Sequence, residues 1–181
     1  MRGKPNQRRF EMLLREHQGI VFKVAGVYAR DAHESEDLAQ EIAAQLWRSF
    51  GSFDESRAKF TTWMYRVALN VAISHVRCAK RSIAEQVEPL DSVHLETVAD
   101  EHGSQHEVME RDERVAALHA FIAQLDPLNR ALVLLHLEDR SYAEIADVLG
   151  ISETNVATKL NRVRQKLREK VVMAKTAGGE T

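Results

Sequence analysis

The chain has few residues of the kinds that cross-link, interrupt or anchor a fold. Cys78 is the only cysteine among 181 residues, which excludes an internal disulfide and any zinc site built on paired cysteines. Three prolines and eight glycines leave long stretches uninterrupted. No apolar run approaches membrane-spanning length, and the first residues lack the apolar core of a secretion signal. We therefore expect that the chain does not itself insert into a membrane and that it resides in the cytoplasm.

Apolar residues recur at helical spacing almost throughout, which predicts an all-α protein. One segment departs from this pattern, because it has weak periodicity, Pro89, Gly103 and few large apolar groups. We therefore expect two small helical domains, 8–80 and 107–173, joined by a flexible acidic linker over 81–106.

Charge is unevenly distributed along the chain, although the formal net charge is only −2. Residues 56–81 hold six lysines and arginines and no acid. Residues 82–113 hold ten acids and one base, and residues 152–175 hold seven bases and two acids. Binding to a polyanion depends on the local field, so the two basic segments are candidate nucleic-acid surfaces.

The second domain contains a pattern typical of a helix-turn-helix. Ser141 can cap a short helix, Gly150 can end it in a left-handed conformation, and Ser152 can cap the next helix. The apolar face of the first helix comprises Tyr142, Ile145, Ala146 and Leu149. The second helix is expected to bury Val156, Leu160, Val163, Leu167 and Val171. An ordinary helical hairpin with a solvated basic face remains the alternative.

The other face of that second helix carries side chains that can bond base edges or phosphates. Its N-terminal turns, where base contact is most expected, hold Thr154, Asn155, Thr158 and Lys159. Further along, where phosphate contact is expected, come Arg162, Arg164 and Lys166.

In the first domain, a helix from about Ser35 to Phe50 should bury one apolar face. That face comprises Leu38, Ala39, Ile42, Ala43, Leu46, Trp47 and Phe50. Three polar residues, Asp37, Gln40 and Glu41, cluster on its opposite side. For exposed carboxylates a solvated face is the ordinary interpretation.

A further helix begins near Thr61 or Thr62, after a small, polar and basic loop over 50–59. The spacing predicts burial of Phe60, Met64, Val67, Ala68 and Val71. It leaves a polar stripe of Thr62, Arg66, Asn70, Ser74 and Arg77. The nearby aromatics, Phe53, Phe60, Trp63 and Tyr65, either stack unpaired nucleotides or belong to the core.

Three segments together resemble the bacterial RNA polymerase sigma factors, specifically the small two-domain extracytoplasmic-function type. Residues 36–41 with Leu46 and Trp47 resemble the motif that grips the polymerase clamp helices. Residues 60–70 resemble the promoter-melting and minus-ten segment, and residues 132–167 resemble the domain that reads the minus-thirty-five element. The order and the domain lengths agree over nearly the whole chain.

The resemblance implies a role for each surface. Core polymerase binding falls to Asp37, Leu38, Gln40, Glu41 and Trp47. Minus-ten DNA binding, with capture of a flipped base by the 50–59 loop, falls to Lys59, Thr62, Trp63, Arg66, Asn70, Ser74 and Arg77. Minus-thirty-five binding falls to Thr154, Asn155, Thr158, Lys159, Arg162, Arg164 and Lys166. The resemblance implies that the acidic linker threads toward the polymerase active-site channel, but an unstructured tether would have the same composition. An anti-sigma factor is an expected partner.

Three positions depart from many relatives. Leu69 stands where a basic residue is common, Ser74 where aspartate is common, and Ala157 where lysine is common. Promoter preferences therefore cannot be copied from any one relative.

The sequence predicts binding rather than catalysis. It has no HExxH motif, no phosphate-binding glycine loop and no nucleophile with a paired base. His102 and His106 could share a metal on a helix, but they lie in the expected linker, so we expect neither metal nor cofactor. The expected function is a sigma factor that binds core polymerase and promoter DNA. Alternatives are a stand-alone helix-turn-helix regulator and a helical adaptor protein that does not touch DNA.

Overall fold

The computed structural model describes residues 4–85 and 105–177, and every regular element within these two ranges is a helix. The elements are α1 (Lys4–Tyr28), α2 (Ala32–Ser49), the short 3-10 helix η1 (Phe50–Ser52), α3 (Phe60–Glu85), α4 (Gln105–Gln124), α5 (Pro127–Leu137), α6 (Tyr142–Leu149) and α7 (Glu153–Ala177). The all-α prediction is confirmed. None of the helices in the described ranges is long and apolar enough to span a membrane.

The chain divides into two compact units, one up to Ala123 and one from Gln124 onward. Helix α3 continues to Glu85 and α4 begins at Gln105, so both extend into the segment expected as a linker. Residues 86–104, most of that segment, lie outside the described residues. The linker and the domain bounds around it therefore stay predictions.

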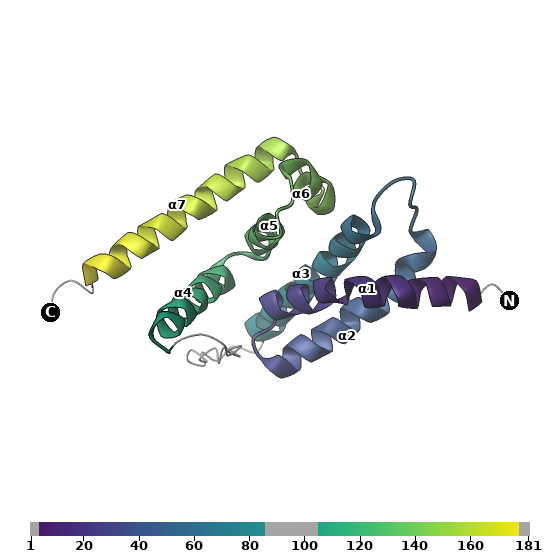
Figure 1. Cartoon of the computed structure of the whole chain (residues 1–181), viewed down its shortest axis with the longest axis horizontal. Coiled ribbons are helices and arrows are strands. Elements are labelled where there is room, and N and C mark those ends of the chain that lie inside the picture. The colour runs from purple at the N-terminus through teal and green to yellow at the C-terminus, as the bar shows by residue number, and fades with distance from the viewer. Residues whose placement is uncertain (1–3, 86–104, 178–181) are drawn as a thin grey trace. The chain divides into compact units, whose positions relative to one another are not determined.

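In the first unit, α1, α2 and α3 pack against one another in pairs (Figure 1). Helix α2 begins at Ala32, three residues earlier than expected, because the Asp31 carboxylate accepts a hydrogen bond from the Glu34 backbone N–H at 2.8 Å. The fully buried side chains of this unit include Val24, Leu38, Ile42, Leu46, Met64, Tyr65 and Leu69.

Two expectations about this core were wrong. Trp47 is 45% exposed rather than buried, and its ring contacts Phe10 at a centroid distance of 5.2 Å. Thr62 is only 8% exposed and belongs to the core rather than to the polar stripe. Because α3 packs against both α1 and α2, its buried face is wider than one stripe and takes in Tyr65 and Leu69.

In the second unit, α5, α6 and α7 pack together and each begins at a side-chain cap. Asp126 caps α5, with Pro127 as its first residue. Ser141 and Glu144 form a reciprocal capping box at α6, and the Ser152 hydroxyl accepts from the Asn155 N–H at 3.2 Å. Gly150 ends α6 with φ +67°, so the two helices are joined by the tight turn that the sequence predicted.

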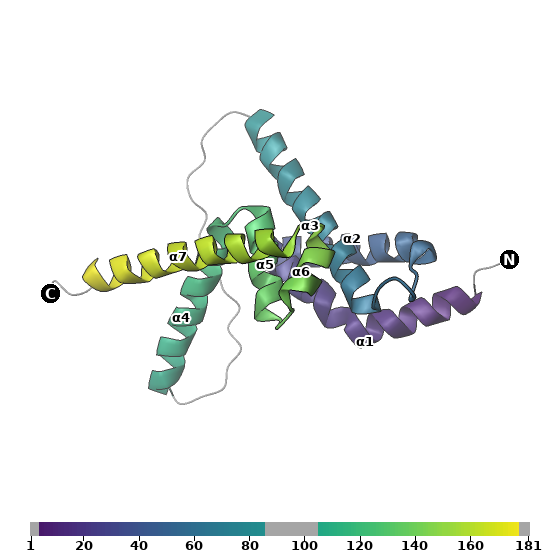
Figure 2. The same cartoon turned by 90° about the horizontal axis from the view of Figure 1, so that it is seen from above.

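The N-terminal half of α7 carries the buried stripe of this unit. Val156, Leu160 and Val163 are buried against the neighbouring helices, whereas Leu167 is only half-buried. Val171 was expected to be buried but is 48% exposed. The reason is visible in Figure 1 and Figure 2, where the C-terminal half of α7 continues beyond α5 and α6.

The Gly150 turn generates a stability prediction. An alanine Cβ at this position would meet no atom within 4 Å, so the substitution is disfavoured by the positive φ alone. We expect Gly150→Ala to lower the free energy of unfolding by about 1 kcal/mol. Urea unfolding followed by helical circular dichroism measures the change.

The control is Gly26→Ala in α1, where a Cβ also meets nothing within 4 Å but the backbone is helical. This substitution should raise the stability by roughly 0.5–1 kcal/mol. A Gly150→Ala variant as stable as the wild type would contradict the importance of the left-handed turn.

Candidate nucleic-acid and protein interfaces

The exposed side of α7 presents the polar residues expected at the start of a recognition helix. Thr154, Asn155 and Thr158 are exposed, and Lys159 is half-buried. The Thr158 hydroxyl donates to the Thr154 carbonyl at 2.8 Å, which fixes its rotamer along the helix. Because Val156 and Leu160 point into the core, these polar side chains face outward, where a DNA groove could be read.

The four α7 cations that the sequence assigns to DNA fall into two groups. The side chains of Lys159, Arg162 and Lys166 form no hydrogen bond or ion pair with any other residue in the described part of the chain. Arg164, by contrast, donates to His136 Nε2 of α5 at 2.8 Å and to Asn161 Oδ1 at 3.3 Å. The Arg164 guanidinium therefore has hydrogen-bond partners inside the folded unit, whereas the other three cations have none among the described residues.

His136 connects the three helices of this unit and was not identified from the sequence. Its Nε2 accepts from Arg164 of α7, and its ring contacts Tyr142 of α6 edge-on at 6.3 Å. Acceptance at Nε2 requires the neutral ring to carry its proton on Nδ1. A lone histidine in an apolar run gave no signal of such a role.

The polar stripe of α3 is present without Thr62. Asn70, Ser74 and Arg77 are exposed, and Arg66 is half-buried. Lys59, just before the helix, is also exposed. The structure therefore places these five residues on the accessible side of the molecule, whereas Thr62 is buried in the core.

Aromatic rings gather where the 50–59 loop meets α3. Phe50 and Phe60 are buried, whereas Phe53 and Trp63 are half-buried and lie 5.2 Å apart between ring centroids. Tyr65 is in the core. The two interpretations of the aromatics thus apply to different residues, because only Phe53 and Trp63 have a partly accessible face on which a base could stack.

Two local contacts shape that loop. The Asp54 carboxylate accepts from the Ser56 backbone N–H at 2.9 Å and from its hydroxyl at 2.7 Å, and these bonds hold the pKa of Asp54 below its ordinary value. Glu55 forms an ion pair with Arg9 of α1. The loop is therefore turned at Asp54 and attached to α1 at Glu55.

The opposite face of α2 is acidic and exposed, as expected. Asp37, Gln40 and Glu41 are all exposed, and His33 Nδ1 lies 3.3 Å from Asp37 Oδ2. Trp47 adds an exposed ring to the same helix. Leu38 is fully buried, so it can support this surface but cannot touch a partner.

A polar network that the sequence did not reveal ties α2 to α3. The Glu34 carboxylate accepts from the Arg30 backbone N–H at 2.5 Å, from Arg30 Nε at 3.0 Å and from His75 Nε2 at 2.9 Å. Burial favours a raised pKa for Glu34, but the hydrogen bonds from Arg30 and His75 outweigh it and lower the pKa to about 2. Glu34 and His75 are 41 residues apart, so their hydrogen bond could not be predicted from local sequence spacing.

Metal chemistry has no candidate in the described part of the chain, where no three histidine, cysteine or acidic side chains gather. Of the two histidines that could share a metal on a helix, His102 lies outside the described residues. Cys78 is exposed and takes part in no disulfide.

Two protein families match this chain. Residues 13–82 match Sigma-70 region 2, and residues 116–167 match Sigma-70, region 4. The RNA polymerase sigma-H factor of Pseudomonas aeruginosa is 32% identical over 168 residues, covering 88% of this chain and 84% of that protein. The ECF RNA polymerase sigma factor SigW of Bacillus subtilis is 26% identical over 172 residues, covering 93% and 91%.

Solved structures share the fold as well. One is CnrH in complex with the cytosolic domain of CnrY, with a TM-score of 0.62, 20% identity and coverage of 92% of this chain and 90% of that chain. Another is the sigma factor RpoE in complex with the anti-sigma factor NepR from Bartonella quintana, with a TM-score of 0.68, 20% identity and coverage of 90% and 96%.

The Glu34 network generates a pH prediction. A depressed carboxyl pKa means that ionised Glu34 stabilises the fold above about pH 4.5, and that this contribution is lost as the pH falls from 4.5 toward 2. We expect Glu34→Gln to lower the free energy of unfolding by about 1 kcal/mol at pH 7, with a smaller difference at pH 3. Urea unfolding at both pH values measures it.

Glu36→Gln serves as the control, because Glu36 is an exposed acid of the same helix that forms no hydrogen bond or ion pair among the described residues. Its effect on stability should be near zero at both pH values. Equal effects of the two substitutions would show that the network adds nothing beyond removal of one charge.

Proposed function

This chain belongs to the sigma factors of bacterial RNA polymerase, of the extracytoplasmic-function type, and we propose how its surfaces divide the steps of initiation. A sigma factor directs transcription initiation at promoters. The observation that carries this function is the presence of both sigma regions, in order, in one chain. A stand-alone helix-turn-helix regulator would leave the first region unexplained.

The acidic face of α2 is the proposed surface for core polymerase. Asp37, Gln40 and Glu41 are exposed together, and Trp47 offers a large ring on the same helix. Exposed aromatics beside charged groups are typical of protein interfaces. Buried Leu38 holds the helix in place beneath this surface.

The accessible side of α3 is the proposed surface for minus-ten DNA. Arg66 and Arg77 would meet phosphates, and Asn70 and Ser74 can bond base edges or sugars. Phe53 and Trp63 would stack on a flipped base, and such contacts must offset the few kcal/mol that flipping costs. The phosphodiester chemistry itself would belong to the polymerase, so this chain would not be an enzyme.

The exposed face of α7 is the proposed reader of the minus-thirty-five element. Asn155 and Thr158 lie in the first turns, where a helix in the major groove meets base edges. Lys159 and Arg162 carry positive charge that no described residue neutralises. Such cations bind phosphates by releasing counterions.

We also propose regulation by an anti-sigma factor and action in the cytoplasm. The support is by analogy, because one of the solved structures with this fold is a sigma factor bound to an anti-sigma factor.

In vitro transcription with purified core polymerase on a genomic fragment library tests the function directly. We expect discrete start sites that depend on this protein and share two spaced upstream elements. With Asp37→Arg and Glu41→Arg combined, holoenzyme formation should weaken by about a hundredfold or more, because like charges facing each other cost several kcal/mol. Size-exclusion binding and transcription both measure the loss.

The matched control is Glu11→Arg with Glu16→Arg, which makes the same charge change on exposed positions of α1. This control should bind core polymerase like the wild type. Normal binding by the α2 variant would overturn the assignment of the acidic face.

The two groups of α7 cations predict different effects of two arginine substitutions. Arg162→Ala should reduce the magnitude of the salt slope of promoter binding by about 0.9, the contribution of one phosphate contact. Arg164→Ala should leave the slope unchanged and lower the stability, because Arg164 is bonded to His136. Fluorescence anisotropy from low to moderate salt, together with urea unfolding, separates the two effects. Reversed results would mean that the two arginines exchange roles in the complex.

A further inference from the structure

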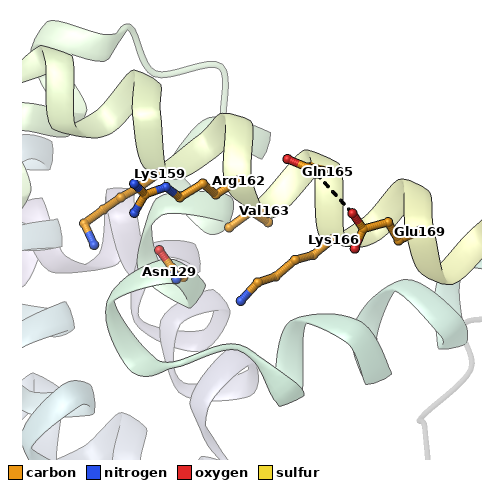
Figure 3. Close-up of a pocket in the computed structure, with 7 residues that line it drawn as sticks. All are labelled: Asn129, Lys159, Arg162, Val163, Gln165, Lys166 and Glu169. Carbon is orange, nitrogen blue, oxygen red and sulfur yellow. Dashed lines mark hydrogen bonds between the residues drawn. The ribbon is translucent and has the colours of Figure 1, made fainter.

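A pocket of about 350 Å³ lies between α5 and α7, within the second unit. Figure 3 shows that Asn129 of α5 faces the side of α7 from which the basic side chains extend. The pocket is lined by Asn129, Lys159, Arg162, Val163, Gln165, Lys166 and Glu169. Buried Val163 forms its apolar wall, and the remaining lining is polar.

The charge of this pocket is predominantly positive. Three cations, Lys159, Arg162 and Lys166, line it, and none has a partner within the described part of the chain. Glu169 is the single acid among the lining residues, and its carboxylate accepts from Gln165 Nε2 at 3.1 Å. Cations that line one pocket repel one another, and an anion between them would relieve that repulsion.

The side-chain oxygen of Asn129 is a hydrogen-bond acceptor for which its own helix supplies no donor. Its backbone N–H donates to Asp126 Oδ1 at 3.1 Å, and its Nδ2 donates to Asp126 Oδ2. The Asp126 carboxylate therefore fixes the amide orientation, because an oxygen placed there would be repelled. Asn129 Oδ1 is then buried without a hydrogen-bond partner in the described structure. Such an atom costs free energy unless a donor reaches it.

We propose that this pocket seats one backbone phosphate of minus-thirty-five DNA, and that Asn129 is a positioning residue for the contact. The phosphate bonds to the ends of Arg162 and Lys166, and Asn129 Oδ1 accepts an N–H from a neighbouring cation and so limits its rotamers. Because the pocket lies on α5, the DNA interface extends beyond the helix-turn-helix. The inference rests on the proposed promoter binding.

DNA is favoured as the occupant because the pocket is continuous with the reading face of α7. Lys159 lies one turn after Asn155, and Arg162 one turn after Thr158, so a duplex held at the first turns passes alongside the pocket. A phosphate there fixes register without reading sequence.

The first test compares two charge removals in the holoenzyme, on a promoter found by transcription. Lys166→Gln removes a pocket cation, whereas Arg168→Gln removes an exposed cation of the same helix that does not line the pocket. We expect Lys166→Gln to reduce the magnitude of the salt slope by about 0.9. Between about 50 and 200 mM salt, its affinity then falls roughly threefold less than that of the wild type. Arg168→Gln should retain the wild-type slope.

The second test locates the phosphate and examines Asn129. Single neutral methylphosphonate linkages are placed in turn along the minus-thirty-five duplex. One linkage should weaken wild-type binding by about threefold or more, and this loss should be smaller in Lys166→Gln and in Asn129→Ala. A merely structural role for Asn129 would weaken binding equally at every linkage.

The outcomes separate the two proposals. Failure of the wild-type holoenzyme to bind the unmodified promoter would overturn promoter recognition and this inference together. Normal wild-type binding without any linkage that couples to Asn129 or Lys166 would overturn the pocket assignment alone. Equal slopes for the wild type and Lys166→Gln would also overturn it, and would leave an acidic protein segment as the alternative occupant.

Discussion

The burial of Val156, Leu160 and Val163 against α5 and α6 determines the direction of every polar side chain on the first turns of α7. In a helix the direction of each side chain is set by its position in the sequence. Once the apolar stripe is packed against the core, Asn155, Thr158 and Lys159 must therefore lie on the accessible side. The Gly150 turn and the caps at Ser141 and Ser152 then set where that helix begins. The exposed polar face that we propose for reading the minus-thirty-five element is therefore a consequence of packing.

The first unit follows the same physical rule with a different result. Helix α3 has neighbours on two sides, so it buries a wide face and leaves only a narrow accessible one, which is the proposed surface for minus-ten DNA. The bond from His75 to Glu34 joins this helix to α2, whose exposed face is acidic. Two surfaces of opposite character are thus held by one small core, and a change in the angle between α2 and α3 would move both.

The sequence predicted the features that depend on neighbours along the chain. The all-α class, the caps at Ser141 and Ser152, and the left-handed Gly150 all follow from local rules, and the structure has them. The sequence-based predictions failed where burial depends on residues far away in the chain. Thr62 is buried because α3 packs on two sides, and Trp47 stays 45% exposed because Phe10 covers only part of its ring. Val171 is exposed because α7 extends beyond the helices that pack against its N-terminal half. The contacts of Glu34 with His75, and of Arg164 with His136, were invisible for the same reason.

This distinction changes how charge should be counted. Residues 152–175 hold seven bases, and composition alone would suggest that each of them contacts one DNA phosphate. In the folded chain Arg164 is bonded to His136 and Lys170 to Gln124, so both have internal partners that DNA would have to displace. Lys159, Arg162 and Lys166 have none among the described residues and share one pocket. The salt dependence of binding by this helix should thus reflect about three phosphates rather than seven, because these three cations are both unpaired and gathered at the pocket, whereas the exposed Arg168 lies outside it.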